Sequence, residues 1–134
     1  MSGASHSYKD DTTIVDAAEL WRRIPPCHIV PDKNLGGKRI SKAAFDDHRD
    51  GTPKSVVLGE EVVSSGRDAH SVLEGHDGVC LASVTAGLAR SLNQAVVRSP
   101  LDDEPAHAEV FGKKTDSVRK RFAREAAWVI GPET

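Results

Sequence analysis

The clearest pattern of apolar and polar positions lies in the second half of the chain, where it predicts two strands separated by a helix. Residues 79–83 (VCLAS) form a mostly apolar run of strand length, and residues 95–98 (AVVR) form a second run. Between them, Leu88 and Leu92 fall on one face of a helix predicted over 86–92. A connection of about a dozen residues is near the lower limit for parallel pairing. The pattern therefore predicts a β-α-β unit.

The C-terminal part of the chain predicts a strand, a helix and a short edge strand. The first strand covers residues 106–111, whose side chains alternate between two faces. Thr115 is the expected N-cap of a helix that ends near residue 127. The apolar residues of this helix recur four positions apart and form one stripe: Val118, Phe122 and Ala126. Residues 128–130 predict the edge strand.

The first half has a weaker pattern, which we interpret as a helix, a strand and a second helix around an irregular segment. Apolar residues recur at roughly helical spacing over 15–24 (VDAAELWRRI), and Pro25 ends the predicted helix. Residues 25–54 are rich in Pro and Gly turns and predict no regular element. Residues 55–58 (SVVL) predict a strand, and Asp68 is the expected N-cap of the second helix.

These elements together predict the α+β class. We expect a single small mixed sheet that contains the β-α-β unit and carries the C-terminal amphipathic helix on one face. The 134 residues fall in the range of one domain. Residues 1–14 are mostly polar, so we expect a disordered N-terminal tail of 1–14 and a single domain over 15–131.

Composition narrows the setting. The chain has 18 Lys and Arg against 20 Asp and Glu, so its net charge of −2 gives no overall attraction to nucleic acid or to an anionic membrane. Its cysteines, Cys27 and Cys80, form no CxxC motif, which is typical of a reducing compartment. The chain has neither a basic segment followed by an apolar stretch at its start nor a membrane-length apolar run. We therefore expect a cytoplasmic protein without membrane contact.

The strongest local charge asymmetry lies at the start of the last predicted helix. Lys113 and Lys114 precede the helix and Arg119 lies in its first turns, where free N–H groups and the helix dipole favour a phosphate or carboxylate. Six basic residues fall between 113 and 124, against Asp116 alone. The alternative is a solvated helix face, balanced by the acidic residues at 102–104.

Two further groups of residues are candidates for chemistry. His107 and Glu109 project from the same side of a strand, and a carboxylate beside an imidazole suits general acid or base catalysis. Such a pair also arises by chance on any half-buried strand. Arg23 and Arg39 lie near or in the irregular segment, and the planar guanidinium group of an arginine matches the geometry of a phosphate or carboxylate. The alternative there is that Arg23 is the polar side of a short helix.

The histidines near the middle of the chain do not predict a metal site. His70, His76 and Cys80, with Asp68 or Asp77, give a spacing that matches no common zinc motif, so we expect no metal. The residues themselves identify no cofactor.

The layout of the chain resembles an uncharacterised group of small bacterial proteins. The resemblance is carried by residues 19–24 (ELWRRI), 31–45 (PDKNLGGKRISKAAF) and 102–115 (DDEPAHAEVFGKKT). It covers most of the expected domain and implies a bacterial, cytosolic setting. It implies no particular activity.

A more distant resemblance is to ADP-ribosyltransferase-like folds, in which an early arginine, a serine-bearing strand and a late glutamate meet around NAD. Arg22 or Arg23, Ser41 and Glu109 occur in this order. The chain departs from the family pattern at the serine, where it reads ISK, and Glu109 lacks the expected flanking residues. The resemblance implies NAD as a ligand, and these departures count against it.

Two classes of function therefore remain open. The first is an accessory or binding module whose basic C-terminal helix contacts a partner protein or, on the charge argument alone, nucleic acid. The second is a small enzyme acting on a nucleotide, NAD or another phosphorylated substrate, with His107 and Glu109 as acid and base and the basic residues holding an anion. We favour the first class, because only His107 and Glu109 are placed relative to each other by local geometry.

Overall fold

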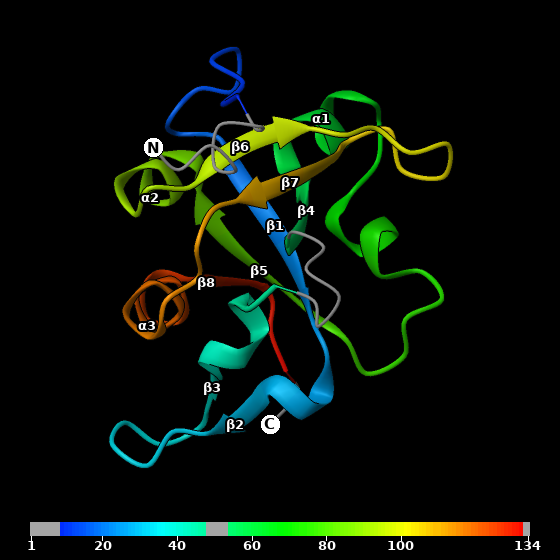
Figure 1. Cartoon of the computed structure of the whole chain (residues 1–134). Helices are drawn as coiled ribbons and strands as arrows, with labels where there is room; N and C mark the ends of the chain where they lie inside the picture. Colours follow the sequence, from blue (N-terminus) through cyan, green and yellow to red (C-terminus); the bar gives the residue numbers. More distant parts are fainter. Residues whose placement is uncertain (1–8, 48–53, 133–134) are drawn as a thin grey trace.

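The computed structural model describes residues 9–47 and 54–132, which form a six-stranded sheet with helices on both faces and a two-stranded ribbon beside it (Figure 1). The strands are β1 (Glu19–Ile24), β2 (Ile29–Pro31), β3 (Lys38–Ile40), β4 (Lys54–Leu58), β5 (Cys80–Thr85), β6 (Ala95–Arg98), β7 (His107–Phe111) and β8 (Ala127–Ile130). The α-helices are α1 (Gly59–Ser64), α2 (Ala86–Ser91) and α3 (Asp116–Glu125), and the 3-10 helices are η2 (Pro26–His28), η3 (Lys42–Phe45) and η4 (Ala69–Leu73).

The sheet has the strand order β6-β7-β4-β1-β5-β8, and every neighbouring pair is antiparallel. The α+β class is therefore confirmed, whereas the predicted mixed sheet with a parallel β-α-β unit is wrong. β5 and β6 do flank α2, but β1, β4 and β7 lie between them in the sheet. The prediction failed because β1, from the first half of the chain, was not identified as a strand.

The helix predicted over 15–24 is also wrong, because Glu19–Ile24 forms β1 near the middle of the sheet. Leu20 and Ile24 contact the core on one face of the sheet, and Trp21 contacts the core on the other. A strand covered on both faces has apolar residues on both sides, so it loses the simple alternation of a half-buried strand. The remaining apolar residues then fall at helical spacing by coincidence.

Most elements predicted in the second half are confirmed. Strands occur at β5, β6 and β7, and β8 forms the edge of the sheet next to β5. Thr115 caps α3, where its Oγ1 accepts a hydrogen bond from the Val118 amide at 3.3 Å. Phe122 of α3 is 2% exposed and its ring stacks on Phe45, with 5.4 Å between the ring centroids. Local capping and periodicity thus place these elements correctly.

The predicted disorder of residues 1–14 is wrong for residues 9–14, and residues 1–8 lie outside the described part of the chain. Ile14 is 3% exposed and belongs to the larger core. Asp10 forms an ion pair with Arg90 of α2 at 3.0 Å, and the Asp11 amide donates to the Val96 carbonyl at 2.9 Å. Burial of Ile14 and these polar contacts offset the ordering entropy of this segment.

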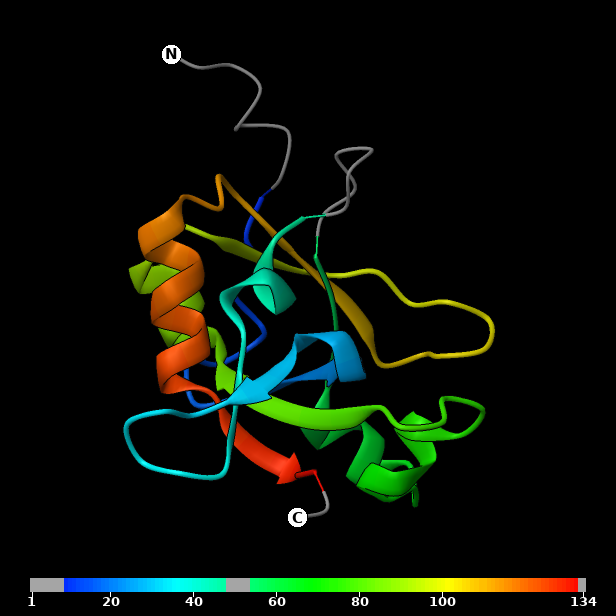
Figure 2. The same ribbon diagram turned by 90° about the horizontal axis from the view of Figure 1, so that it is seen from below.

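The segment predicted to be irregular, residues 25–54, contains the β2–β3 ribbon and the helices η2 and η3, while residues 48–53 lie outside the described part. Figure 2 shows the ribbon and η3 on the same side of the sheet as α3. The larger core lies on this side, and its residues come from the sheet, η3, α2 and α3. The smaller core lies on the opposite side, under α1 and η4. In the described residues, no helix is long and apolar enough to cross a membrane.

Candidate functional site

Two basic residues project from the middle of the sheet into the side covered by η3 and α3. Arg22 lies on β1 between Leu20 and Ile24, and Lys54 lies at the start of β4 on the same face as Val56, so both extend into the larger core. Lys54 is only 6% exposed. β1 and β4 are neighbours in the sheet, so the two side chains are near each other.

A short helix on the far side of these residues contributes one carbonyl. η3 begins at Ser41, whose Oγ accepts a hydrogen bond from the Ala43 amide. The Arg22 Nε donates to the Ala44 carbonyl of this helix at 3.2 Å. Among residues 9–47 and 54–132, the Lys54 ammonium group has no hydrogen bond and no ion pair. Within the described part of the chain, the carboxylates of Asp47 and Asp46 act on its charge only at longer range.

A second buried lysine lies at the approach to α3. The Lys114 side chain is 2% exposed, and its Nζ donates to the carbonyls of Val110 and Gly112 at 2.9 and 3.1 Å. It also forms an ion pair with Asp47 at 3.0 Å. The Lys114 ammonium group thus makes two hydrogen bonds to backbone carbonyls and one ion pair.

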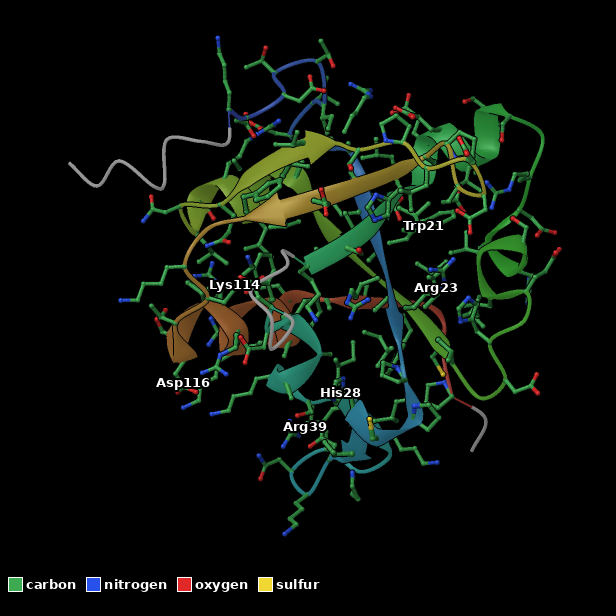
Figure 3. The ribbon with its side chains drawn as sticks, turned by 45° about the vertical axis from the view of Figure 1, so that its right-hand side comes forward. Trp21, Arg23, His28, Arg39, Lys114 and Asp116 are labelled. Atoms are coloured by element: carbon green, nitrogen blue, oxygen red, sulfur yellow. The ribbon has the colours of Figure 1, made fainter. Side chains whose placement is uncertain are left out.

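His28, at the end of η2, is the fourth member of the group. Its Nδ1 atom is buried and makes no hydrogen bond with the described residues. Burial lowers the pKa of His28, and the positive charges of Lys54 and Arg22 lower it further. His28 is therefore a neutral imidazole at pH 7 with a buried polar atom left unsatisfied. Figure 3 shows His28 and Lys114 on one side of β1, and Trp21 and Arg23 on the other.

We call Arg22, His28, Lys54 and Lys114 the cationic site. Two carboxylates act on it, and both have other partners: Asp47 pairs with Lys114, and Asp46 pairs with Arg119 at 3.1 Å. Among the described residues, positive charge consequently exceeds negative charge in this region of low exposure.

The pKa values of the cationic site reflect this imbalance. Burial, reinforced by the charge of Arg22, lowers the pKa of Lys54 to about 8. Burial likewise lowers the pKa of Arg22 to about 10, with a smaller contribution from Arg23. The pKa of Lys114 is lowered by burial, although Asp47 opposes the effect. A negative group bound among these residues would reverse these shifts, because it favours the charged forms.

The residues predicted to bind an anion are only partly brought together. Lys114 belongs to the cationic site, and Arg119 lies beside it and holds Asp46. Lys113 is exposed, and its backbone carbonyl accepts a hydrogen bond from Gln94. Arg23 projects to the opposite side of the sheet, where its Nε donates to the Val72 carbonyl at 2.7 Å.

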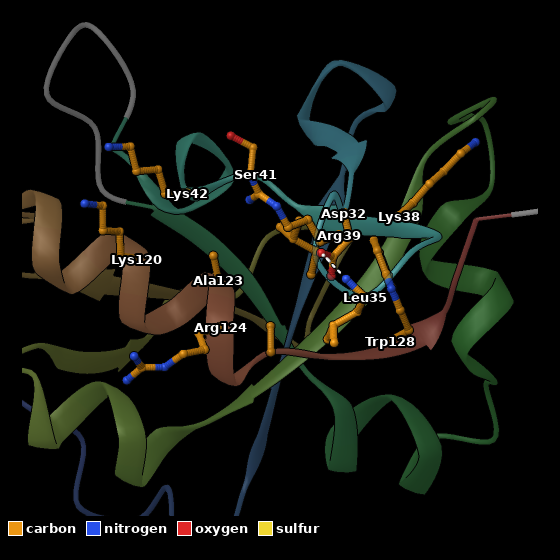
Figure 4. A pocket seen from close by; sticks show the side chains of 12 residues that line it. Asp32, Leu35, Lys38, Arg39, Ser41, Lys42, Lys120, Ala123, Arg124 and Trp128 are labelled. Carbon is orange, nitrogen blue, oxygen red and sulfur yellow. Dashed lines mark hydrogen bonds between the residues drawn. The ribbon is translucent and has the colours of Figure 1, made fainter.

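Arg39 lines a separate pocket of about 550 Å³ between β3, η3 and α3 (Figure 4). We call this the basic pocket. Its basic residues come from both sides: Lys38, Arg39 and Lys42 from the ribbon and η3, and Lys120 and Arg124 from α3. Trp128 of β8 also lines the pocket, and Asp32 is its acidic residue.

The predicted acid and base pair lies on the face of β7 opposite the cationic site. His107 and Glu109 share this face, as the alternation predicts. The His107 ring nitrogens contact the Ser99 carbonyl at 2.7 Å and the Ser55 hydroxyl at 2.9 Å. His107 is thus held by Ser99 and Ser55, and its catalytic role with Glu109 stays a prediction.

Sequence reasoning missed Lys54 and His28, and it considered Arg22 without placing it in a site. No local motif marks Lys54, which follows a turn-rich segment and joins Arg22 only through the pairing of β4 with β1. A basic residue between two buried apolar positions, as at Arg22 in LWRRI, is the one signal that could have identified the site.

No group of three or more His, Cys, Asp or Glu side chains in residues 9–47 and 54–132 is placed to hold a metal ion. Comparison of the chain with protein-family models, curated proteins and solved structures finds no match. The site must therefore be interpreted from its own geometry.

Proposed function

We propose that the protein binds a small anionic ligand at the cationic site, through a phosphate or carboxylate group. The observation that supports the proposal is the gathering of Lys54 and Arg22 on one face of the sheet, where Lys54 is 6% exposed and where burial lowers the pKa of both groups. Perturbed ionisable groups concentrate at functional sites. A bound anion would favour the charged forms of both side chains.

The geometry favours an anion with several oxygens. Only the Nε of Arg22 is engaged by a described residue, so the outer nitrogens of its guanidinium group remain for a carboxylate or phosphate. The Lys54 ammonium group can donate up to three hydrogen bonds, and none of them is made to residues 9–47 or 54–132. In a site of low exposure, such charge-assisted hydrogen bonds are about twice as strong as neutral ones.

The proposal includes the cytosolic, bacterial setting expected from the sequence. Cys27 is an exposed free thiol and Cys80 is a buried one, which is consistent with a reducing compartment. Anion binding is compatible with both classes of function expected from the sequence, a binding module and an enzyme that acts on a phosphorylated substrate.

Thermal unfolding with inorganic phosphate tests the proposal. In a phosphate-free buffer at constant ionic strength, phosphate at a hundred times its dissociation constant adds about 2.7 kcal/mol and raises the midpoint by roughly 5 to 10 °C. Arg22→Met and Lys54→Met should abolish this increase. Lys33→Met is the matched control, because Lys33 is exposed and its loss removes the same charge.

Two results would contradict the proposal. One is the absence of any shift with phosphate, pyrophosphate or pyruvate in the wild type. The other is an equal loss of the shift in Lys33→Met and Lys54→Met, which would mean that phosphate acts by general screening of positive charge.

The basic pocket supports a second candidate function, binding of a nucleotide beside the basic C-terminal helix. Its basic residues come from separate segments, so the fold and not one helix gathers the charge. The half-buried Trp128 offers a surface for a base, and the cations suit phosphates.

Titration with ATP, followed by tryptophan fluorescence, tests this second function. Arg39→Ala and Arg124→Ala should weaken binding, and Trp128→Phe should remove the fluorescence change. Arg121→Ala is the control, because Arg121 lies on the same helix and pairs with Glu125 away from the pocket. Equal weakening by Arg121→Ala would reject a site at the basic pocket.

A further inference from the structure

The cations of the basic pocket are spread along its length. Its five basic residues come from the ribbon, η3 and α3. Figure 4 shows Lys42 and Lys120 at one end of the pocket, and Lys38 and Trp128 at the other. On α3, Lys120 and Arg124 are separated by one helical turn, about 6 Å along the axis. A single phosphate group cannot contact cations at both ends, whereas a chain of phosphates can.

The carboxylates near the pocket are already shared with other groups. The Oδ1 atom of Asp32 accepts hydrogen bonds from two backbone amides of the β2–β3 turn, at 3.0 and 3.1 Å, so this carboxylate stabilises the turn. The Asp116 carboxylate pairs with three cations, Lys42, Lys120 and Arg119. Within the described part of the chain, the basic residues that line the pocket therefore outnumber the carboxylates that pair with them.

The end of the pocket away from Lys42 and Lys120 also has two apolar side chains. Leu35, in the β2–β3 turn, is 88% exposed and has the most exposed large apolar side chain of the described residues. Trp128 packs against the larger core and also lines the pocket, so the core holds its ring in place. A ligand that fits this end has a flat apolar group next to its negative charges, and a nucleotide has this combination.

We propose that the basic pocket binds single-stranded nucleic acid, with an unpaired base against Trp128 and Leu35 and with the phosphates along the cations. The inference rests on the second candidate function, nucleotide binding at this pocket, and names a polymer as the ligand. A positively charged groove with an aromatic platform is the arrangement that binds single strands without sequence preference. The bases of a duplex are paired and stacked on each other, so they cannot stack on Trp128.

Fluorescence anisotropy of the full chain with labelled oligo(dT) and oligo(U) tests the inference. We expect each single strand to bind at least about tenfold more tightly than ATP or a duplex of the same length, at the same salt concentration. Binding should also quench tryptophan fluorescence. The quenching reports on Trp128, because the other tryptophan, Trp21, is 6% exposed and contacts the core on the opposite face of the sheet.

Two kinds of variant separate stacking from charge. Trp128→Leu should weaken binding by about 5- to 150-fold and leave its salt dependence unchanged. Leu35→Ser should weaken binding by a smaller factor, and it does not depend on folding because Leu35 is exposed. Arg124→Ala should reduce the slope of log affinity against log salt concentration by about 0.7, the value for one phosphate contact. Arg121→Ala is the matched control, because Arg121 pairs with Glu125 and does not line the pocket.

The outcomes separate this inference from nucleotide binding. If ATP binds at the pocket and the single strands bind no more tightly than ATP, the polymer is wrong and nucleotide binding stands. If neither ATP nor the single strands bind, both are wrong. Equally tight binding of the duplex or of polyglutamate would overturn the inference, because general attraction of polyanions would then explain it. Unchanged affinity in both Trp128→Leu and Leu35→Ser would contradict the contact with a base.

Discussion

Replacing Lys54 with methionine should stabilise the ligand-free protein. Methionine has a similar volume and no charge, so Lys54→Met removes a buried cation without leaving a large cavity. The ordinary lysine pKa is 10.5 and the folded-state value is about 8, a difference that corresponds to about 3 kcal/mol. Replacing buried charges with apolar residues gains about 1 to 4 kcal/mol in other proteins. We therefore expect Lys54→Met to raise the free energy of unfolding by about 1 to 3 kcal/mol at pH 7.

The pKa of Lys54 also predicts how the stability of the wild type changes with pH. Between pH 8 and pH 10.5 the unfolded chain holds a proton on Lys54 that the folded protein has lost. Wild-type stability should therefore rise across this interval, because the unfolded state binds more protons. The charge at Lys54 destabilises the fold fully below pH 8 and no longer does so above 10.5. The advantage of Lys54→Met should shrink accordingly between these pH values.

Urea unfolding in phosphate-free buffer at pH 7 and pH 10 measures both effects. Lys33→Met serves as the control for general charge and for the titration of other lysines at high pH, because Lys33 is exposed. The reasoning is refuted if Lys54→Met is less stable than wild type at pH 7. It is equally refuted if the difference in stability between the two proteins does not change with pH.

Three further substitutions test the packing, each by urea unfolding. Arg67→Ala removes the partner of Glu104, whose side chain is 8% exposed, and should cost about 3 kcal/mol. Because Arg67 lowers the pKa of Glu104, the difference in unfolding free energy between wild type and Arg67→Ala should become smaller as the pH falls below 4.5. Gly59→Ala places a Cβ 2.4 Å from the Trp21 ring and should cost about 2 kcal/mol, and an unchanged stability would contradict this packing. Phe122→Ala removes a buried ring, 2% exposed, and should lower the free energy of unfolding by about 3 to 5 kcal/mol. A loss below about 1 kcal/mol would contradict the packing of α3 through Phe122.

Elements defined by short-range chemistry could be predicted from the sequence. Thr115 is followed by an apolar stripe, and α3 begins where the cap requires. The alternation over 106–111 correctly gives the faces of β7, because one of its faces is buried and the other is half-exposed. Both predictions depend on neighbours within a few residues, which the sequence displays directly.

The cationic site could not be predicted in this way, because long-range pairing creates it. Arg22 and Lys54 belong to segments 32 positions apart in the chain and become neighbours when β1 pairs with β4. The error over β1 was decisive: as part of a helix, Arg22 would be a solvated polar residue. In a central strand, the same side chain must extend into the core on one face of the sheet.

Partners, and not burial alone, distinguish the cationic site from the other arginines and lysines of low exposure. Arg67 makes a bidentate contact with Glu104, and Arg90 of α2 pairs with both Asp10 and Asp16. Their hydrogen-bonded carboxylates raise the arginine pKa values, as expected for structural ion pairs. At Lys54 the direction is reversed, because burial and the charge of Arg22 outweigh the longer-range attraction of Asp47 and Asp46. Among residues 9–47 and 54–132, the structural arginines thus have carboxylates in hydrogen-bond contact, whereas Lys54 interacts with its carboxylates only at longer range.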